Sequence, residues 1–142
     1  MQMLKDKNIV IIGGTTGIGL SAAKAFVSEG AKVVVVGRSE DNVQQAIKDL
    51  GKSAAAISGD AAHPHTARKA VDICLQKFNG FDGLYHVAGG SGRKLGDGPL
   101  HELTLEAWNK TMELNLTSIM LSNQAAVKEF IRMQKPGCIL NM

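Results

Sequence analysis

A glycine-rich turn near the start of the chain is the feature that most limits how this sequence can fold. The turn, Gly13-Gly14-Thr15-Thr16-Gly17-Ile18-Gly19, directly follows the nearly all-apolar segment Asn8–Ile12. A short apolar, β-branched segment predicts a parallel strand that is covered on both faces. After the turn, apolar residues recur at helical spacing as far as Gly30; they are Ile18, Ala22, Ala25 and Phe26. The glycines therefore lie where a buried strand turns into a helix.

Such a strand–turn–helix unit is suited to binding a pyrophosphate. Backbone N–H groups and the positive end of the helix must come close to the phosphates, and side chains at the turn would obstruct this approach. The sequence context required of a dinucleotide-binding turn is present. The residues we expect to bind a nicotinamide cofactor here are Gly13, Thr15, Thr16, Gly17, Ile18 and Gly19. The alternative is a tight turn that binds no ligand.

Strand and helix patterns alternate along the rest of the chain. Further strands are predicted at residues 31–36, 53–58, 83–88 and 138–142. Helices are predicted from Ser39 to Gly51, over 67–78, and as two successive helices over 105–116 and 119–131, with a loop at 89–100. The helix that starts at Ser39 is expected to bury an inward face of Val43, Ala46, Ile47 and Leu50. This alternation predicts a single α/β domain, residues 1–142, with a parallel sheet and helices on both faces.

Composition excludes several classes of protein. The net charge is +3, the basic residues are scattered, and aromatic residues make up 4%, so a nucleic-acid partner is not expected. The longest apolar run is too short to cross a bilayer and no secretory signal is present, which predicts a cytoplasmic protein with no membrane partner. Cys74 and Cys138 lack metal-ligand spacing. We expect both to be buried free thiols, and we expect no metal site.

The spacing of the turn resembles the Thr-Gly-x-x-x-Gly-Ile-Gly turn of the short-chain dehydrogenase/reductase family, with Ile12 in place of the threonine. Ala88-Gly89 matches the second half of the family's Asn-Asn-Ala-Gly motif, with His86 and Val87 where the asparagines would be. The resemblance covers essentially the whole chain. It implies a Rossmann-type doubly wound sheet of strand order 3-2-1-4-5, which here ends at the fifth strand.

The same resemblance assigns roles to further residues. Asp60, with Ala61 beside it, stands where the family binds the adenine ring, and the backbone of Ala88 and Gly89 would line the cofactor. Asn115 matches the asparagine of the family's catalytic tetrad. Asp60 as a simple turn residue and Asn115 as a polar residue at a helix junction remain alternatives. In contrast, we expect His86 to be a hydrogen-bonded core residue rather than a catalyst.

The end of the second strand indicates which nicotinamide cofactor is preferred. An acidic residue that binds the ribose 2′-hydroxyl of NAD is expected there, but the sequence has Gly37-Arg38-Ser39. Without a carboxylate to repel it, a 2′-phosphate can be bound by the forked guanidinium of Arg38 and the hydroxyl of Ser39. NADP is therefore favoured over NAD. The alternative is that Arg38 stacks on the adenine or faces solvent.

The acid that the family's chemistry needs is absent from these 142 residues. The family reduces carbonyl groups or oxidises alcohols with a serine and a Tyr-x-x-x-Lys motif, but the only tyrosine, Tyr85, has Gly89 four positions later. We therefore expect a fragment of a longer reductase for small-molecule substrates, inactive by itself. A complete but non-catalytic dinucleotide-binding regulatory module is one alternative, and an enzyme that reduces an enoyl thioester is another. The helices at 105–116 and 119–131 resemble those that pair subunits in the family, so we expect a homo-oligomer, either a dimer or a tetramer.

Overall fold

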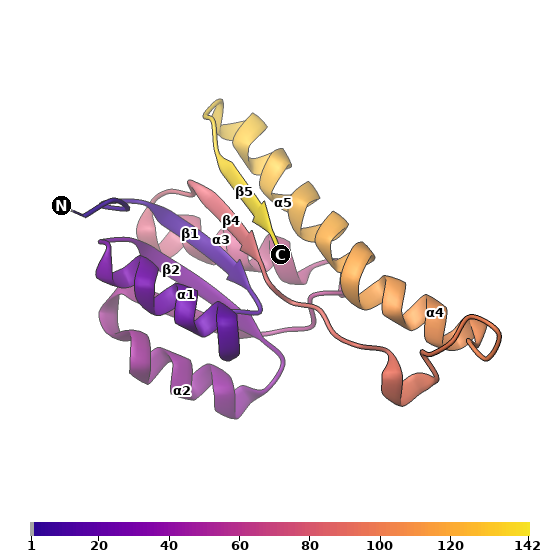
Figure 1. The fold of residues 1–142 in the computed structure, drawn as a ribbon. Coiled ribbons are helices and arrows are strands. Elements are labelled where there is room, and N and C mark those ends of the chain that lie inside the picture. Colours follow the sequence, from indigo (N-terminus) through magenta and orange to yellow (C-terminus); the bar gives the residue numbers. More distant parts are fainter. Residues whose placement is uncertain (1) are drawn as a thin grey trace.

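Five parallel strands form one sheet in the order β3-β2-β1-β4-β5 (Figure 1). The structure is a computed structural model that describes residues 2–142. The strands are β1 (Asn8–Ile12), β2 (Lys32–Gly37), β3 (Ala54–Ser58), β4 (Gly83–His86) and β5 (Cys138–Asn141). This arrangement confirms the predicted doubly wound sheet and its strand order.

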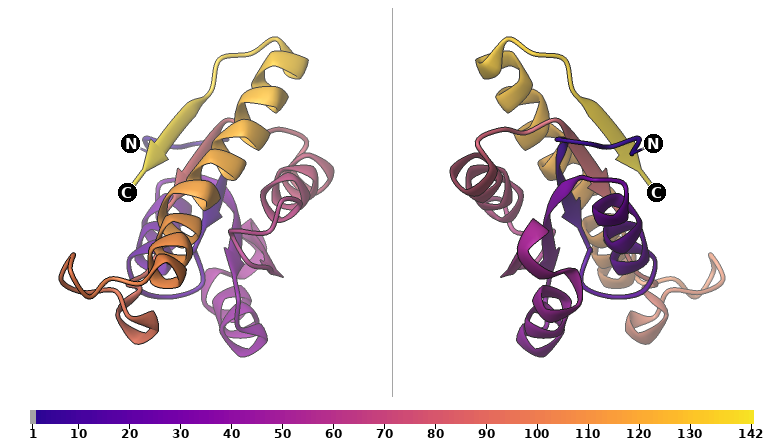
Figure 2. Two further views of the ribbon diagram at one scale, coloured as in Figure 1. Left: turned by 90° about the vertical axis from the view of Figure 1, so that its right-hand side faces the viewer. Right: turned by 90° about the vertical axis from the view of Figure 1, so that its left-hand side faces the viewer.

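Helices cover both faces of the sheet (Figures 1 and 2). The helices are α1 (Gly17–Ser28), α2 (Glu40–Leu50), α3 (Thr66–Phe78), α4 (Leu105–Met112) and α5 (Ser118–Met133), with short helical turns η1 (Gly51–Ser53), η2 (Arg93–Leu95) and η3 (Glu113–Thr117). Side chains of a strand alternate between faces, so Val33 and Val35 lie on the face covered by α1 and α2, while Val34 and Val36 lie on the face covered by α3 and α5. The run of four valines in β2 is thus explained by a strand buried on both faces.

One residue predicted to face inward, Ile47, lies on the surface, and two of the apolar residues that recur along α1 are exposed as well. Ile18 is 57% exposed, Ile47 is 37% exposed, and Ala25 is also exposed. In α1 the buried positions are taken by Gly19 and Ala23, because small residues let the helix approach the sheet closely. The prediction of an inward-facing Ile47 was therefore wrong, since the buried stripe of each helix is narrower than its apolar pattern.

The predicted pair of helices after residue 105 forms one continuous helical segment. α4 passes into η3, a π-helical turn, and then into α5 without a break. A π-helical turn leaves carbonyl groups without their usual i+4 amide partners. Beside this turn, the side-chain amide of Asn115 donates to the carbonyl of Thr111, in α4, at 2.9 Å. Asn115 therefore lies within a helical turn rather than at a junction between separate helices.

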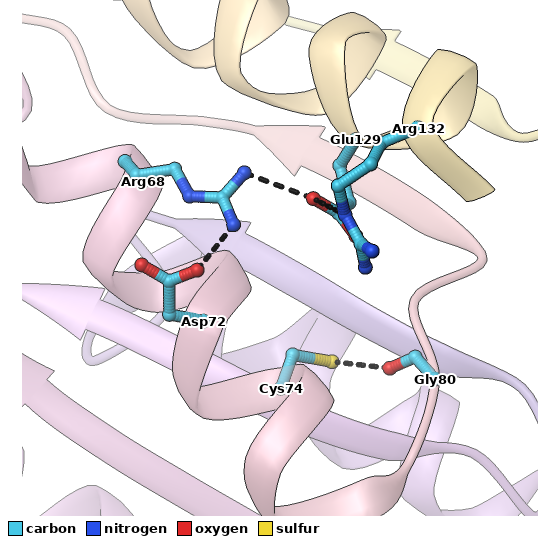
Figure 3. Close-up of polar contacts among 6 residues, drawn as sticks. All are labelled: Arg68, Asp72, Cys74, Gly80, Glu129 and Arg132. Atoms are coloured by element: carbon cyan, nitrogen blue, oxygen red, sulfur yellow. Dashed lines mark hydrogen bonds and ion pairs between the residues drawn. The ribbon is translucent and has the colours of Figure 1, made fainter.

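A buried carboxylate joins α5 to α3 (Figure 3). The side chain of Glu129 on α5 is fully buried and accepts hydrogen bonds from Arg132 on the same helix and, at 2.9 Å, from Arg68 on α3. Arg68 also pairs with Asp72. The hydrogen bonds from Arg132 and Arg68 hold the pKa of Glu129 below its ordinary value, although burial opposes them. A charged group that is buried must be paired in this way to be tolerated.

The two cysteines differ from each other. Cys74 on α3 is buried and its thiol donates to the carbonyl of Gly80 at 3.3 Å (Figure 3). Burial raises the pKa of this thiol to about 12. In contrast, Cys138 is exposed, so its predicted burial was wrong. It lies on β5, at the edge of the sheet, with no strand beyond it in the described chain.

Candidate functional site

A pocket of about 380 Å³ opens at the carboxyl ends of the strands, where the strand order reverses between β1 and β4. Ligands of open α/β sheets bind at this position. The glycine turn, the end of β2, and the segments after β3 and β4 all line it, together with η3 and α5. The lining comprises Ile12 and Gly13, residues 15–19, 36–39, 59–62 and 87–89, Asn42, Leu114 and Ser118.

The pocket brings together every residue that the sequence predicted to bind the cofactor. They come from four segments of the chain: Gly13, Thr15, Thr16, Gly17, Ile18, Gly19, Arg38, Ser39, Asp60, Ala61, Ala88 and Gly89. Asn115 does not line the pocket, although Leu114 and Ser118 on either side of it do. The predicted set is therefore brought together except for its one catalytic candidate.

Backbone contacts fix the glycine turn against its neighbours. The amides of Gly13 and Gly14 both donate to the carbonyl of Val36 at the end of β2, at 2.9 and 3.0 Å. Gly13 has φ +88°, and a Cβ there would lie 2.7 Å from the amide nitrogen of Ala88. Only glycine allows the turn and the segment after β4 to approach this closely.

The start of α1 offers unpaired backbone donors to the pocket. The side chain of Thr16, the N-cap residue, makes no capping hydrogen bond, and the first bond back to it comes from the amide of Leu20 at 3.1 Å. The amides before Leu20 belong to the first turn, where a helix has no internal acceptors. A Cβ at Gly17 would meet no atom within 4 Å, so the missing side chain leaves open space. These features fit an anionic group such as a pyrophosphate.

The two threonines of the turn lie in different surroundings. Thr15 is buried, and its hydroxyl oxygen would collide with a Cβ at Gly37. The side chain of Thr15 is therefore packed beneath the end of β2. Thr16 is exposed on the pocket side. Of the two predicted hydroxyl donors, Thr16 has the freer side chain.

The end of β2 presents one cation and one hydroxyl. The guanidinium of Arg38 is exposed and pairs with no carboxylate among residues 2–142. The hydroxyl oxygen of Ser39 caps α2 by accepting from the amide of Asn42 at 3.4 Å, which leaves its hydrogen free to donate. Glu40 and Asp41 follow in the first turn of α2 and partly offset the positive charge of Arg38.

Asp60 adopts the geometry of a simple turn residue, which was the alternative to a role in binding the cofactor. One carboxylate oxygen, Oδ1, accepts from the amide of Ala62 at 2.9 Å, and the Asp60 carbonyl accepts from the amide of His63 at 3.0 Å. Asp60 thus shapes the loop after β3. Its side chain still lines the pocket, so the turn and a binding role are compatible.

The segment after β4 turns away from the sheet at His86, two residues earlier than predicted. The amides of Val87 and Ala88 both donate to the carbonyl of Ile12, at 2.8 and 2.9 Å. His86 itself is fully buried, with Nδ1 2.7 Å from the hydroxyl of Ser122 and Nε2 2.9 Å from the carbonyl of Ala88. The prediction of a hydrogen-bonded core histidine is confirmed.

Asn115 holds the loop that follows the pocket-lining segment. Its Oδ1 accepts from the amide of Gly90 at 3.0 Å, and its Nδ2 donates to the Gly90 carbonyl at 2.7 Å. A Cβ at Gly89 would lie 2.7 Å from the same Oδ1. With the Nδ2 contact to Thr111, both amide hydrogens of Asn115 are used. Asn115 therefore joins η3 to the start of the loop beside the pocket.

Several pocket residues were not foreseen from the sequence. Asn42, Leu114 and Ser118 lie on helices whose orientation toward the pocket depends on the tertiary fold. Only Asn42 could have been predicted to line the pocket from the sequence. It lies in the first turn of the helix after β2, and that turn must start at the carboxyl edge of the sheet, where the pocket is. No group of three or more histidine, cysteine, aspartate or glutamate side chains within residues 2–142 is arranged to hold a metal ion. Over the same residues, no helix combines the length and apolar character needed to span a membrane.

The chain belongs to the short-chain dehydrogenase family. The family model described as short chain dehydrogenase matches residues 7–142, which includes the whole sheet and the pocket. The family comprises nicotinamide-dependent oxidoreductases, so the fold and the lining of the pocket agree with the family assignment.

Curated relatives align over nearly the entire chain. A 3beta-hydroxysteroid dehydrogenase 1 of Eggerthella lenta is 28% identical over 98% of this chain and 53% of its own length. The 2,5-dichloro-2,5-cyclohexadiene-1,4-diol dehydrogenase LinX of Sphingobium indicum is 30% identical over 98% of this chain and 55% of its own. The chain spans about half the length of these two relatives. It spans 81% of a third, the short chain dehydrogenase/reductase dpmpG of Macrophomina phaseolina, at 31% identity over 98% of this chain.

Solved structures agree with this assignment. A short chain dehydrogenase from Bacillus anthracis superposes with a TM-score of 0.87 at 27% identity, covering 98% of this chain and 56% of that one. A short-chain type dehydrogenase/reductase from Mycobacterium ulcerans gives a TM-score of 0.86 at 28% identity, covering 96% of this chain and 50% of that one.

Proposed function

We propose that residues 1–142 are the cofactor-binding part of an NADP-preferring short-chain reductase, which transfers hydride between the nicotinamide and a carbonyl or alcohol substrate. The observation that carries the NADP preference is the unpaired guanidinium of Arg38 at the pocket edge, beside the Ser39 hydroxyl. Arginine and a hydroxyl are suited to a phosphate, whereas NAD specificity uses a carboxylate at this point.

The lining of the pocket supports a division of roles along the dinucleotide. The free amides at the start of α1 and the Thr16 hydroxyl bind the pyrophosphate, and Arg38 with Ser39 binds the 2′-phosphate. Asp60 and Ala61 contact the adenine end. The backbone of Ala88 and Gly89 lies along the nicotinamide half, where the glycine at position 13 lets the turn approach the Ala88 amide closely.

We assign Asn115 to the catalytic tetrad by its match to the family motif. Its hydrogen bonds to Gly90 and Thr111 support a role in holding the backbone beside the reacting end of the cofactor. The bound nicotinamide supplies the hydride. The protonating tyrosine and its lysine are absent from these 142 residues, so we propose that catalysis needs further polypeptide and that this chain alone is inactive.

Relatives and exposed surface support a broader proposal about substrate and assembly. The names of two relatives specify a hydroxysteroid and a cyclohexadienediol, both of which are alcohols. We therefore propose a small-molecule alcohol or carbonyl substrate, in a cytoplasmic protein. A homo-oligomer is proposed from the apolar side chains exposed along α4, η3 and α5: Leu105, Trp108, Leu116, Met120, Val127 and Ile131.

Calorimetric titration of the chain with NADPH and NADH tests the cofactor assignment. We expect NADPH to bind more tightly, and Arg38→Ala to weaken NADPH binding about tenfold while NADH changes little, because charge-assisted hydrogen bonds to the 2′-phosphate are lost. Arg93→Ala is the matched control, since Arg93 lies on η2 outside the pocket lining. Equal affinity for both dinucleotides, unaffected by Arg38→Ala, would show that the NADP preference is wrong.

The same titration leaves the regulatory module as a distinct outcome. A non-catalytic module would bind the dinucleotide with the same dependence on Arg38. Carbonyl reduction by a longer polypeptide that includes a Tyr-x-x-x-Lys motif distinguishes the enzyme from the module.

A further inference from the structure

His86 lies at the centre of a buried polar network that the proposed roles do not use. The ring is fully buried on β4, and both of its nitrogens have partners: the Ser122 hydroxyl at 2.7 Å and the Ala88 carbonyl at 2.9 Å. The Ser118 hydroxyl lies 3.4 Å from Nε2. Ser118 and Ser122 are also buried, one turn apart on α5. The network therefore connects α5 to the segment after β4 through the imidazole.

The partners determine where the proton of a neutral ring lies. A carbonyl only accepts, so Nε2 carries the hydrogen and donates it to Ala88. Nδ1 is then an acceptor, and the Ser122 hydroxyl donates to it in preference to the Ile119 carbonyl, which is farther away at 3.0 Å. Burial lowers the pKa of His86 and outweighs the opposing effect of the Ala88 hydrogen bond, in agreement with a neutral ring.

The hydrogen bond of the ring ends on the backbone of the pocket. Ala88 and Ser118 both line the pocket, and the Ala88 amide is within close contact of the glycine turn at Gly13. The amide side of Ala88 is held by the Ile12 carbonyl at 2.9 Å. The carbonyl side is held by His86. Both the amide and the carbonyl of Ala88 are therefore hydrogen-bonded, although β4 has already ended at His86 and no strand pairing holds this residue.

A purely space-filling role does not account for this arrangement. An apolar side chain would fill the same volume without the cost of burying two ring nitrogens and two hydroxyl groups. The Val87 amide also donates to the Ile12 carbonyl, but among residues 2–142 no side chain is hydrogen-bonded to the Val87 backbone. What the imidazole adds is a donor directed at the Ala88 carbonyl.

We propose that His86 is a positioning residue: oriented by the Ser122 hydroxyl, it fixes the Ala88 peptide in the pocket and so links α5 to the backbone that faces the cofactor. This inference rests on the proposed function for its effect on cofactor binding. The fixing of the Ala88 peptide is a property of the chain without ligand. The two parts can therefore be measured separately.

The test compares four variants of the full 142-residue chain. His86→Gln keeps a donor near the position of Nε2, whereas His86→Leu removes both polar atoms at similar volume. Ser122→Ala removes the hydroxyl that donates to Nδ1. Val71→Ala is the control for general destabilisation, because Val71 is a buried residue of α3 outside the pocket lining.

Two readouts are taken without ligand. Imidazole nitrogen shifts by NMR report the tautomer, and His86 is distinguishable because His63, His65 and His101 are exposed. We expect the Nε2–H tautomer in the wild type and a mixed population in Ser122→Ala. Hydrogen exchange of the Val87 and Ala88 amides should accelerate about tenfold more in His86→Leu than in Val71→Ala, and His86→Gln should restore most of the protection.

The third readout is NADPH affinity. We expect a loss of about tenfold in His86→Leu, recovery in His86→Gln and no change in Val71→Ala, as for one hydrogen bond that shapes the site. If exchange at Val87 and Ala88 responds to His86→Leu no more than to Val71→Ala, the positioning role is refuted. If the wild type binds neither NADPH nor NADH, the proposed function fails, and the exchange data alone still decide the role of His86.

Discussion

The two thiols of this chain differ in reactivity because one is held inside the molecule and the other is on an edge strand. The pKa of Cys74 is raised to about 12 by burial, and its thiol donates to the Gly80 carbonyl. A protonated, buried thiol is a poor nucleophile. Cys138 is exposed on β5. The residue-scale structure therefore separates two cysteines that the sequence pattern treats alike.

Alkylation of the native chain with iodoacetamide at neutral pH measures this difference. We expect one thiol to react per chain, and mass spectrometry of peptides should place the label on Cys138. Cys138→Ser should abolish rapid labelling, whereas Cys74→Ser should leave it unchanged. Labelling of both cysteines at similar rates in the folded protein would contradict the buried position of Cys74.

Single residues were predictable where short-range sequence sets their surroundings. The residues of the glycine turn and the Ser39 cap depend on neighbours within a few positions. The two serine partners of His86 are 32 and 36 positions away, so no local pattern identifies them. The exposure of Cys138 likewise depends on the place of β5 at the edge of the sheet, which the local sequence does not specify.

Helices α3 and α5 pack together through charge as well as apolar contact. Glu129 is the buried member, and its partners Arg68 and Arg132 have side chains 42% and 65% exposed. The exposed arginines keep much of their hydration, so removing the carboxylate does not strand two buried charges. The contribution of the cluster to the stability of this helix pair is therefore modest and depends on pH.

Glu129→Gln should lower the free energy of unfolding by about 1 kcal/mol at pH 7. The pKa of Glu129 is lower in the folded state than its ordinary value of 4.5, so its ionised form stabilises the fold above that value. This stabilisation is lost as the pH falls through the folded pKa. Wild type and variant should therefore differ at pH 7 in urea unfolding and converge as the pH falls well below 4.5.

Glu106→Gln is the control for the loss of a carboxylate, because Glu106 is exposed on α4. It should change stability less than Glu129→Gln at pH 7. A difference between wild type and Glu129→Gln that stays constant from neutral to acidic pH would show that ionisation of Glu129 contributes nothing.

The positions of most helices and strands followed from periodicity, and the exceptions have physical causes. β4 ends two residues early because the amides of Val87 and Ala88 converge on one carbonyl, that of Ile12. The helical segment around Asn115 is continuous because the π-helical turn η3 joins α4 to α5 without a break, and the Asn115 side-chain amide donates to the Thr111 carbonyl beside it. Such local replacements of backbone hydrogen bonds leave little trace in apolar periodicity.

At the scale of the whole molecule, the order of strands was predictable because parallel connections are right-handed and the family landmarks occur in order. The exposed surface was harder to predict. Apolar side chains remain exposed along α4, η3 and α5, and Leu140 on the edge strand β5 is also exposed. Figure 1 shows that α4 and the loop before it project away from the sheet, so this surface is open to a partner.

Sedimentation velocity at micromolar concentration tests self-association through the helical surface. We expect a dimer or larger species, and we expect the double variant Met120→Glu/Ile131→Glu to shift the chain to monomer by burying charge at the interface. Leu140→Glu is the matched variant on β5 and distinguishes the helical surface from the strand edge. A wild-type chain that sediments as a monomer over this concentration range would contradict the proposed oligomer.

The central claim is that the glycine turn and Arg38 form one dinucleotide site. Titration of the isotope-labelled chain with NADPH, followed by amide NMR shifts, tests it most directly. We predict saturable shifts at the amides of Gly17, Gly19, Arg38 and Ala88, with smaller shifts at Arg38 when NADH replaces NADPH. An absence of shifts, or shifts confined to residues outside the pocket, would contradict the claim.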